Sequence, residues 1–381
     1  MGMEEEKSMV EKKVLTREVE TKLGQVRGIL SRKKLAGALI TRKYNIYWLT
    51  AGGNNQVLYD MQESLIGILV TENRAIVIAE NGDYGRVMDE EFSHCPFEYE
   101  MIYWCSGGVG AKAAEMAKGS LGVDSPVGGV AEQLNIDGDL AEFRQVFLEP
   151  EIERLRSYGA EAASIITKVS KGVQPGMSER EVAAELSKQF LLNSFNVAVI
   201  LIGGDERSLK YRHQVVSDHK IRRHFSLCGV GKKAGITYPI NRVISFGPPP
   251  PELEDNNRKI ETVFVHLNSL AKAGTTLGSI YAKLPQIYVD AGLEEVEWMR
   301  HSIGGTMGYN PREQVVGDRV AYRLRENNVI GWNPSLPGVM AEDVYLLGKS
   351  GLEFITYDEH WPHAERSANG LTQIRPSILV I

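Results

Sequence analysis

The chain has few cysteines and no long hydrophobic run. Only 3 of its 381 residues are Cys, an odd number and too few for a disulfide framework, so a reducing compartment is expected. No stretch of about 18 apolar residues is present, which excludes a transmembrane helix. The charged segments Glu4–Glu6 and Lys12–Lys13 enclose no apolar core of the kind found in signal peptides. We therefore expect a cytoplasmic protein that does not span a membrane.

Positive charge is scarcer than negative charge. The sequence has 43 Lys and Arg against 49 Asp and Glu, for a formal net charge of -6. No basic run is interleaved with aromatic residues, so the sequence argues against a nucleic-acid partner. Hydrophobic residues make up 43% and charged residues 24%, as in folded globular proteins. Because a chain of this length exceeds what one core usually serves, two domains are expected.

The first part of the chain alternates helical and strand patterns, which predicts an α/β domain over residues 1–148. The patterns predict a helix over 18–34 and strands over 36–40, 46–49, 65–70 and 74–79. Glu149-Pro150 ends this domain. Apolar and small residues at helical spacing from Ile152 to Ile166 predict that the second domain, residues 149–381, opens on a long helix. Ser178-x-x-Glu181 is typical of a capping box at the start of the next helix.

Five segments of the second half carry polar residues in an order typical of an active site. They are His213, 228–242, 301–312, Trp332-Asn333-Pro334 and Ala341-Glu342-Asp343. Together with 45–50 in the first domain, they resemble the creatinase/aminopeptidase P/prolidase family. The resemblance implies an N-terminal α/β domain followed by an α+β catalytic domain of the pita-bread fold. It also implies a homodimer.

The metal-dependent members of that family bind two metal ions through five residues. Aligned on Gly235 and Arg242, the five positions are occupied here by Cys228, Pro239, Gly305, Asn333 and Glu342. Two divalent ions about 3.5–4 Å apart need several carboxylate or imidazole ligands. One carboxylate cannot hold two metals. We therefore predict no dinuclear metal centre and no other cofactor.

Part of a metal-free active site remains. Creatinase is a metal-free member of the family. His213 and His301 of this chain match creatinase histidines that suit acid/base work, and Arg312 matches an Arg that binds the substrate carboxylate there. The two Glu that hold the guanidinium of creatine correspond to Asn241 and Asn333. Because two neutral amides do not compensate a buried cation, the resemblance argues against creatine. A neutral amide, lactam or imine group with a carboxylate nearby fits better.

Each of these residues also has a structural interpretation. Histidine titrates near neutrality and suits proton transfer, but a lone His is more often structural. Cys228 fits a small apolar residue of a buried strand better than it fits a nucleophile. Arg312 can pair with a surface carboxylate, and Glu342 can accept backbone hydrogen bonds. Asn241 and Asn333 can be ordinary loop or strand residues.

The leading hypothesis is a metal-independent hydrolase or lyase acting on a C–N bond of a small carboxylate-bearing molecule. The catalytic residues would be His213, His301 and Glu342. The substrate-binding residues would be Arg312, Asn241, Asn333 and Cys228. The second hypothesis is a pseudoenzyme that only binds a ligand or short peptide in the same cleft. A metal-dependent Xaa-Pro peptidase is the weakest hypothesis, because most ligands are absent.

Overall fold

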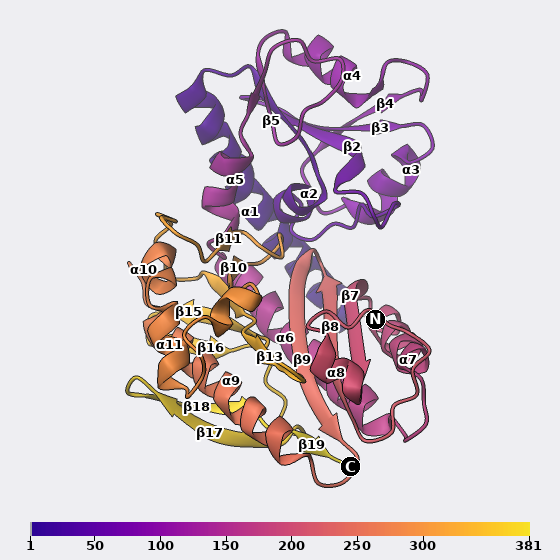
Figure 1. The fold of residues 1–381 in the computed structure, drawn as a ribbon. Coiled ribbons are helices and arrows are strands. Elements are labelled where there is room, and N and C mark those ends of the chain that lie inside the picture. The colour runs from indigo at the N-terminus through magenta and orange to yellow at the C-terminus, as the bar shows by residue number, and fades with distance from the viewer. Residues whose placement is uncertain (1) are drawn as a thin grey trace. The chain divides into compact units, whose positions relative to one another are not determined.

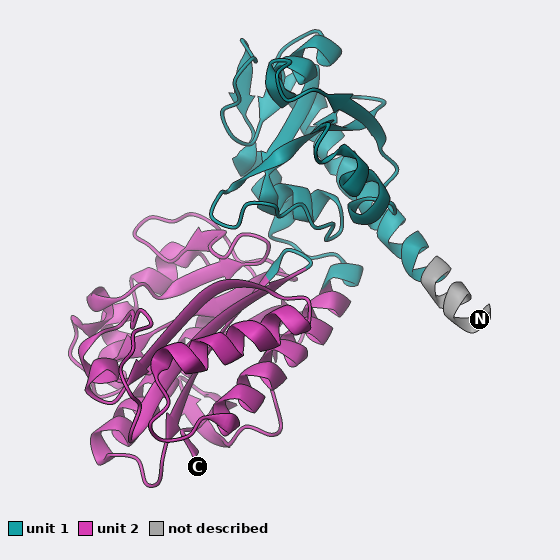
Figure 2. Ribbon diagram, turned by 90° about the vertical axis from the view of Figure 1, so that its right-hand side faces the viewer, with its two compact units in different colours: residues 1–151, 234–236 teal, residues 152–233, 237–381 magenta. Residues whose placement is uncertain are grey.

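The computed structural model describes residues 2–381, with side chains from residue 10 onward. The chain forms two compact units (Figure 2). Unit 1 comprises Met1–Glu151 and Ala234–Ile236, and unit 2 comprises Ile152–Lys233 and Thr237–Ile381. Within the described part of the chain, no helix combines the length and the hydropathy needed to cross a membrane.

Unit 1 contains a mixed six-stranded sheet with helices around it (Figure 1). The strand order is β4-β3-β2-β1-β5-β6, with β2 antiparallel to both β1 and β3 and the other pairs parallel. The strands are β1 (Gly37–Arg42), β2 (Glu63–Val70), β3 (Ala75–Glu80), β4 (Glu98–Ile102), β5 (Leu121–Val123) and β6 (Gln133–Asn135). The helices are α1 (Gly2–Lys33), α2 (Lys43–Leu49), α3 (Tyr84–Arg86), α4 (Gly108–Ala117) and α5 (Asp137–Arg144), with a π-helical turn at Val87–Glu91.

The predicted strands over 65–70 and 74–79 are confirmed as β2 and β3, whereas the prediction for 46–49 was wrong. That segment lies in helix α2, and all four of its residues, Ile46 to Leu49, are buried. A continuous apolar run carries no alternation that separates a buried strand from a short buried helix. The helix is fixed by Asn45, whose amide donates to Asp124 and Asp137 at 2.9 Å each.

Unit 2 contains a four-stranded sheet, a five-stranded sheet and two two-stranded ladders. The four-stranded sheet has the order β19-β9-β8-β7 and the five-stranded sheet the order β11-β10-β12-β15-β16. The strands of the first sheet are β7 (Asn196–Gly204), β8 (His224–Lys233), β9 (Ile236–Ser245) and β19 (Leu379–Val380). Those of the second are β10 (Gly304–Met307), β11 (Gln314–Val315), β12 (Val329–Trp332), β15 (Asp343–Gly348) and β16 (Gly351–Phe354). The ladders pair β13 (Ser335–Leu336) with β14 (Val339–Met340), and β17 (His363–Ala368) with β18 (Leu371–Pro376).

Helices complete unit 2, and two sequence predictions about them are confirmed. The helices are α6 (Glu149–Gly172), α7 (Glu179–Leu192), α8 (Glu206–Lys210), α9 (Pro251–Leu270), α10 (Leu277–Tyr281) and α11 (Leu284–Asp290), with a 3-10 turn at Glu297–Arg300. Helix α6 is the predicted long helix at the start of the second domain. Helix α7 begins with the predicted capping box, in which Glu181 N–H donates to Ser178 Oγ at 3.2 Å and Ser178 N–H donates to Glu181 Oε2 at 2.6 Å.

A buried ionic network joins the two larger sheets of unit 2. Asp343, the first residue of β15, accepts from Arg242 of β9 at 2.9 Å and from Arg375 of β18 at 2.9 Å. Arg375 also donates to Glu261 of α9 at 2.6 Å. These charges are almost fully buried, and each has an opposite partner, which is the condition for burying a charge without a large penalty. The network fixes Glu342, next in sequence to Asp343, against β9.

Candidate functional site

The seven predicted site residues lie on strands and loops of unit 2. Cys228 is on β8 and Asn241 is on β9, Asn333 directly follows β12, and Glu342 directly precedes β15. His213 lies on the loop between α8 and β8, His301 follows the 3-10 turn, and Arg312 lies between β10 and β11. Their contacts divide them into a charged group around Glu342, a histidine pair beside Asn333, and Asn241, which links the strands between them.

The charged group contains Cys228, Arg312 and Glu342. The Cys228 thiol donates to Glu342 Oε2, with Sγ and Oε2 3.3 Å apart. Arg312 Nη2 lies 3.6 Å from the other oxygen, Oε1. The backbone oxygen of Glu342 accepts from Asn241 N–H at 3.0 Å, which ties β9 to the start of β15. The Glu342 carboxylate is thus buried between a neutral donor and a cation.

Burial sets the protonation of this group. Burial raises the pKa of the Glu342 carboxyl, and the adjacent Arg312 guanidinium opposes that shift. Burial also raises the pKa of the Cys228 thiol well above its usual range, and the neighbouring Glu342 carboxylate raises it further. A thiol held in its protonated form is a poor nucleophile. Cys228 therefore acts as a hydrogen-bond donor to Glu342.

The second group is a pair of imidazole rings. His301 Nε2 and His213 Nε2 lie 3.2 Å apart, and the rings meet edge to face at 5.1 Å between centroids. His301 Nδ1 lies 3.1 Å from the backbone oxygen of Asn333, which can only accept. In neutral His301, Nδ1 must therefore carry the proton and Nε2 the lone pair. His213 Nε2 must then donate to His301, which leaves the lone pair of His213 on Nδ1.

The surroundings keep His301 neutral. Burial lowers the pKa of His301, the hydrogen bond to Asn333 opposes that shift, and the nearby His213 ring and Arg212 guanidinium lower the pKa further. Arg212 is itself held by Glu297 and by Ser335, whose hydroxyl accepts from Nη1 at 2.8 Å. A neutral His301 can accept a hydrogen bond from His213 and donate one to the backbone oxygen of Asn333 at the same time. The two rings thus form a short relay that ends at an exposed His213.

The two Asn residues differ in their side-chain contacts. Asn241 is buried, and its amide donates to Ser226 Oγ of β8 at 3.1 Å. Asn333 is also buried, at 7% exposure, but its Oδ1 has no hydrogen-bond partner among the described residues. Its backbone is fixed by the bond to His301 and by the bond of its N–H to Ile303 O at 2.9 Å. Asn333 therefore holds an unpaired amide oxygen in a fixed place.

A small cavity lies beside Cys228 of the charged group. It is lined by Ser226, Cys228 and Asn241, by Arg212 and Gln214, and by the β13–β14 ladder with Leu336, Val339 and Met340. Its volume of about 10 Å³ accommodates roughly one water molecule. Arg212, one of the lining residues, directly precedes His213 in the sequence.

The residues at this place do not fit a dinuclear metal centre. Of the five positions that the family resemblance assigns to metal ligands, only Glu342 carries a carboxylate and only Cys228 a thiol, and these two bond to each other; Asn333 adds one neutral amide oxygen. The Arg312 guanidinium lies beside Oε1 of Glu342, the oxygen that would otherwise be open to a metal ion. At Gly305, a Cβ atom would lie 1.9 Å from the backbone oxygen of Gln314, so the paired strands β10 and β11 leave no room for a His side chain. The site is built around an internal cation.

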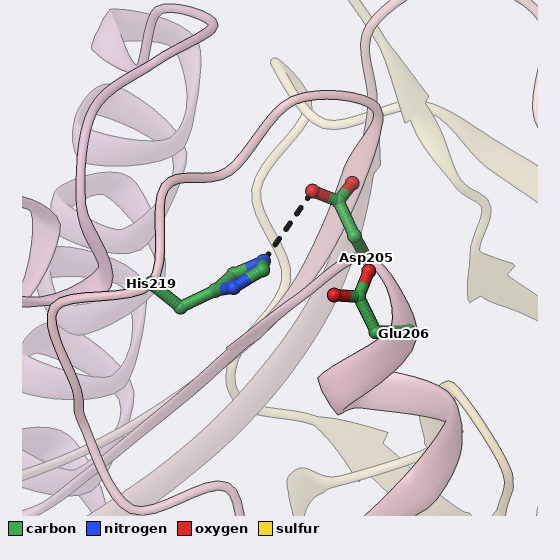
Figure 3. Close-up of side chains that lie close together, drawn as sticks. All are labelled: Asp205, Glu206 and His219. Atoms are coloured by element: carbon green, nitrogen blue, oxygen red, sulfur yellow. Dashed lines mark ion pairs between the residues drawn. The ribbon is translucent and has the colours of Figure 1, made fainter.

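A different cluster brings potential metal ligands together. Among the described residues, Asp205, Glu206 and His219 are the group of three or more His, Cys, Asp or Glu whose ligand atoms all lie within 4.8 Å of one another. In Figure 3 the His219 ring points toward Asp205, with Nε2 and Oδ2 3.5 Å apart. The Asp205 carboxylate already accepts from the backbone N–H groups of residues 222–224, at 2.8–3.2 Å. These bonds explain the cluster as a cap that fixes the loop before β8.

Sequence reasoning missed Arg212, Ser226 and Ser335. Arg212 precedes His213 directly, so its position was a usable signal, but an Arg on a loop has no distinctive spacing. Ser226 lies two residues before Cys228 and therefore on the same face of β8, which strand alternation could have shown. Ser335 is placed by the β13–β14 ladder, whose two-residue strands have no pattern of their own.

Comparison with known proteins identifies the family. Residues 153–356 match the model of metallopeptidase family M24, and residues 22–158 match the creatinase/prolidase N-terminal domain. The chain belongs to metallopeptidase family M24. The predicted creatinase/aminopeptidase P/prolidase membership and the predicted combination of an N-terminal α/β domain with a pita-bread domain are thereby confirmed.

The relatives of this M24 member are distant but cover nearly its whole length. It is 22% identical over 365 residues to an uncharacterised peptidase from Staphylococcus haemolyticus, a match that covers 88% of this chain and 99% of the relative. The prolidase from Pyrococcus horikoshii superposes with a TM-score of 0.74 at 21% identity, covering 89% of this chain and 99% of that one. The Xaa-Pro dipeptidase from Bacillus anthracis gives 0.72 at 19% identity, covering 95% and 100%. At these identities the likeness shows the fold.

Proposed function

We propose that this M24 member is a metal-independent hydrolase or lyase that acts on a C–N bond of a small carboxylate-bearing molecule. The observation that carries the proposal is the relay from Asn333 through His301 to His213, which leaves a proton-accepting nitrogen at an exposed ring. A general base needs a lone pair that the substrate can reach, and Nδ1 of the exposed His213 ring offers one. A homodimer and a cytoplasmic location remain part of this proposal.

The residues take the following roles in a hydrolysis. His213 Nδ1 removes a proton from water while the water oxygen bonds to the carbonyl carbon. The C–N bond then breaks, and the departing nitrogen takes the proton from His213. His301 stays neutral and accepts a hydrogen bond from His213 Nε2, which stabilises the positive ring between the two steps. In a lyase, the same base removes a proton from the carbon beside the C–N bond, the electron pair of that C–H bond forms a C=C bond as the C–N bond breaks, and the departing nitrogen takes the proton from His213.

Arg312 has N–H groups left for a ligand carboxylate beside its contact with Glu342 and the hydrogen bond that Nη1 donates to Pro311 O at 2.9 Å. A guanidinium has five N–H groups in a planar fork, and the Arg312 side chain is 33% exposed. Glu342 orients that fork through Oε1, and Cys228 holds Glu342 through Oε2. We infer that Glu342 is a positioning residue for Arg312. Asn241, which is paired with Ser226, is one of the residues that line the small cavity.

Replacement of His213 by Ala tests the catalytic proposal. Purified protein, prepared in a chelator, is incubated with small N-acyl amino acids, lactams and short peptides, and the release of amine or the opening of the ring is measured. The His213→Ala variant should lose turnover by a factor of about 10²–10⁴ while keeping its folding stability. The control is His360→Ala, an exposed His elsewhere in unit 2. Equal turnover in wild type and His213→Ala would contradict the proposal.

A binding protein without catalysis is the second candidate. It is favoured by the arrangement around Glu342, because the carboxylate is held by Cys228 and Arg312 and takes no direct part in the relay. Absence of turnover in wild type, together with ligand binding in the same cleft, would select this candidate. The solved relatives named prolidase and Xaa-Pro dipeptidase suggest a third candidate, a metal-dependent Xaa-Pro peptidase. The residues at the ligand positions argue against a metal-dependent peptidase, because Glu342 is the one carboxylate among them.

A further inference from the structure

Unit 2 contains a second, larger pocket. Its volume is about 470 Å³, and its walls come from the last residues of α9, from 350–352 and from 369–373. These residues belong to the end of a long helix and to the β15–β16 and β17–β18 turns. The pocket shares no residue with the seven residues of the candidate site or with the small cavity beside Cys228. A volume of this size accommodates a small molecule.

Hydrogen bonds hold the walls of this pocket together. Asn369 Nδ2 donates to Ser269 Oγ at 2.9 Å, which ties the β17–β18 turn to α9. Asn268 Nδ2 donates to Gln373 Oε1 at 2.8 Å, which ties β18 to the same helix. Asn369 and Gly370 both have positive φ, as a two-residue hairpin turn requires. The pocket is therefore formed without a ligand.

The lining of the pocket carries one charged side chain, Lys272. Lys272 is exposed and, among the described residues, pairs with no carboxylate. No Asp or Glu lines the pocket, although acidic residues outnumber basic ones in the chain. An ammonium group without a counter-charge, beside neutral polar groups, favours a carboxylate. One end of the ligand should therefore be negative.

The end of α9 supplies the opposite polarity. Carbonyl groups in the last turn of a helix lack partners within the helix and carry partial negative charge. The N–H groups of Ala271 and Lys272 satisfy two of these carbonyls. The carbonyl of Ser269, a residue of the lining, accepts from no backbone N–H of the described residues. This carbonyl is available to a positive hydrogen-bond donor.

We propose that this pocket binds a free α-amino acid, with the carboxylate at Lys272 and the ammonium at the carbonyl of Ser269. The two charges of an α-amino acid are carried by one carbon atom, so one small molecule meets both groups. A simple anion would pair with Lys272 alone and would face the negative end of the helix. A simple amine would leave Lys272 unpaired and would be repelled by it. The zwitterion is the class for which both ends are favourable.

The pocket is connected to the candidate site by hydrogen bonds. Gln373 accepts from Asn268, and Asn268 Oδ1 accepts from the indole Nε1 of Trp332 at 2.9 Å. Trp332 is fully buried and directly precedes Asn333, whose backbone oxygen bonds to His301. A ligand that reorients the Gln373 amide thus changes the surroundings of the Trp332 indole. Binding should therefore be visible at Trp332, two hydrogen bonds from the pocket.

Two-dimensional ¹H–¹⁵N NMR of the full-length protein tests the inference. The chain has five Trp and so five indole N–H signals, and the Trp332 signal is assigned by its loss in Trp332→Phe. L-Alanine, L-serine and L-leucine are added separately, and calorimetry gives the affinity of each. At least one should shift the Trp332 signal in a saturable way, while the signals of Trp48 and Trp104 in unit 1 stay in place. No saturable binding of any of the three at tens of millimolar would overturn the inference.

Lys272→Met assigns the carboxylate contact. Because Lys272 is exposed, the variant should unfold like wild type, and the Kd of the amino acid should rise about tenfold or more. Lys188→Met, whose side chain lies 62% exposed on α7, is the matched control and should bind like wild type. Unchanged affinity in Lys272→Met would show that the ligand binds elsewhere and would sink the proposed site.

Analogues of each amino acid test the zwitterion. The corresponding amide lacks the carboxylate, and the corresponding α-hydroxy acid lacks the ammonium. Each analogue should bind about tenfold or more weakly than the amino acid itself. Equal affinity of the hydroxy acid would reduce the site to one for simple carboxylates and overturn the assigned ligand class.

The result does not depend on the proposed catalysis, because binding is measured without turnover. His213→Ala should bind the amino acid with wild-type affinity, since His213 does not line the pocket. Loss of binding in His213→Ala together with wild-type binding in Lys272→Met would place the ligand in the candidate site and refute the second pocket. Binding in wild type that depends on Lys272 would support the pocket whether or not the protein is an enzyme.

Discussion

At the scale of single residues, His301 links structure to pH. Folding lowers the pKa of His301 below its ordinary value of 6.5, chiefly through burial. Between the lowered pKa and 6.5, the unfolded chain holds more protons than the folded chain, so stability rises with pH through this window. The contribution of the neutral His301 ring to the unfolding free energy is fully present above this pH window and is lost as the pH falls through the window.

We expect His301→Gln to remove this pH dependence. Gln does not titrate but still offers a donor and an acceptor. The advantage of wild type over the variant in unfolding free energy should therefore shrink between about pH 7 and about pH 5, as measured by urea unfolding. His360→Gln, an exposed position, serves as the control. A constant difference across this range would contradict the assigned state of His301.

Arg312 is expected to stabilise the fold as the counter-charge of Glu342. Arg312→Met leaves a buried carboxylate without its cation. Since the Arg312 side chain is 33% exposed, solvent replaces part of its effect. The loss should be on the order of 1–2 kcal/mol, below that of a fully buried pair. In Arg312→Met/Glu342→Gln, most of this loss should be recovered, as a double-mutant cycle by chemical unfolding would show. Strict additivity would mean that the two side chains do not interact.

At the scale of elements, helix α7 offers a clean comparison. Ser178→Ala removes the acceptor for Glu181 N–H and should lower the unfolding free energy by about 1 kcal/mol. Ser187→Ala in the same helix is the matched control, because its hydroxyl bonds only to Ala183 O within the helix. That variant should be neutral or slightly stabilising, since Ala is the better helix former. Thermal and urea unfolding measure the stability of both variants. An equal loss of unfolding free energy in Ser178→Ala and Ser187→Ala would argue against a stabilising capping box.

Elements with a clear period or cap could be predicted from the sequence, and elements defined by burial could not. Helix α6 and strands β2 and β3 carry their own patterns, and the capping box of α7 is a local signal. Residues 46–49 are buried on all sides, so no alternation distinguishes their helix from a strand. The site shows the same division. Matched motifs indicated His213 and His301, but the contacts of Arg312 with Glu342 and the unpaired Asn333 oxygen depend on tertiary packing.

At the scale of the whole molecule, the balance of charge around Glu342 predicts how the protein responds to metal ions. A metal bound to the native state at a free concentration of about 100 times its Kd would raise the unfolding free energy by about 2.7 kcal/mol. The donor set here offers one carboxylate, one protonated thiol and a competing guanidinium. We therefore expect the thermal unfolding midpoint to be the same with chelator as with manganese, cobalt or zinc.

Elemental analysis gives the complementary measurement. Protein incubated with each ion and then desalted should retain less than one ion per chain, since the dinuclear arrangement needs several convergent carboxylates and a His. The cluster of Asp205, Glu206 and His219 provides an internal check, because any residual metal that His219→Ala abolishes belongs to that cluster. Two ions per chain that survive His219→Ala would contradict a site in which Arg312 is the counter-charge of Glu342. Such a result would require the backbone at Gly305 and Gln314 to open, because no ligand side chain fits there in the present packing.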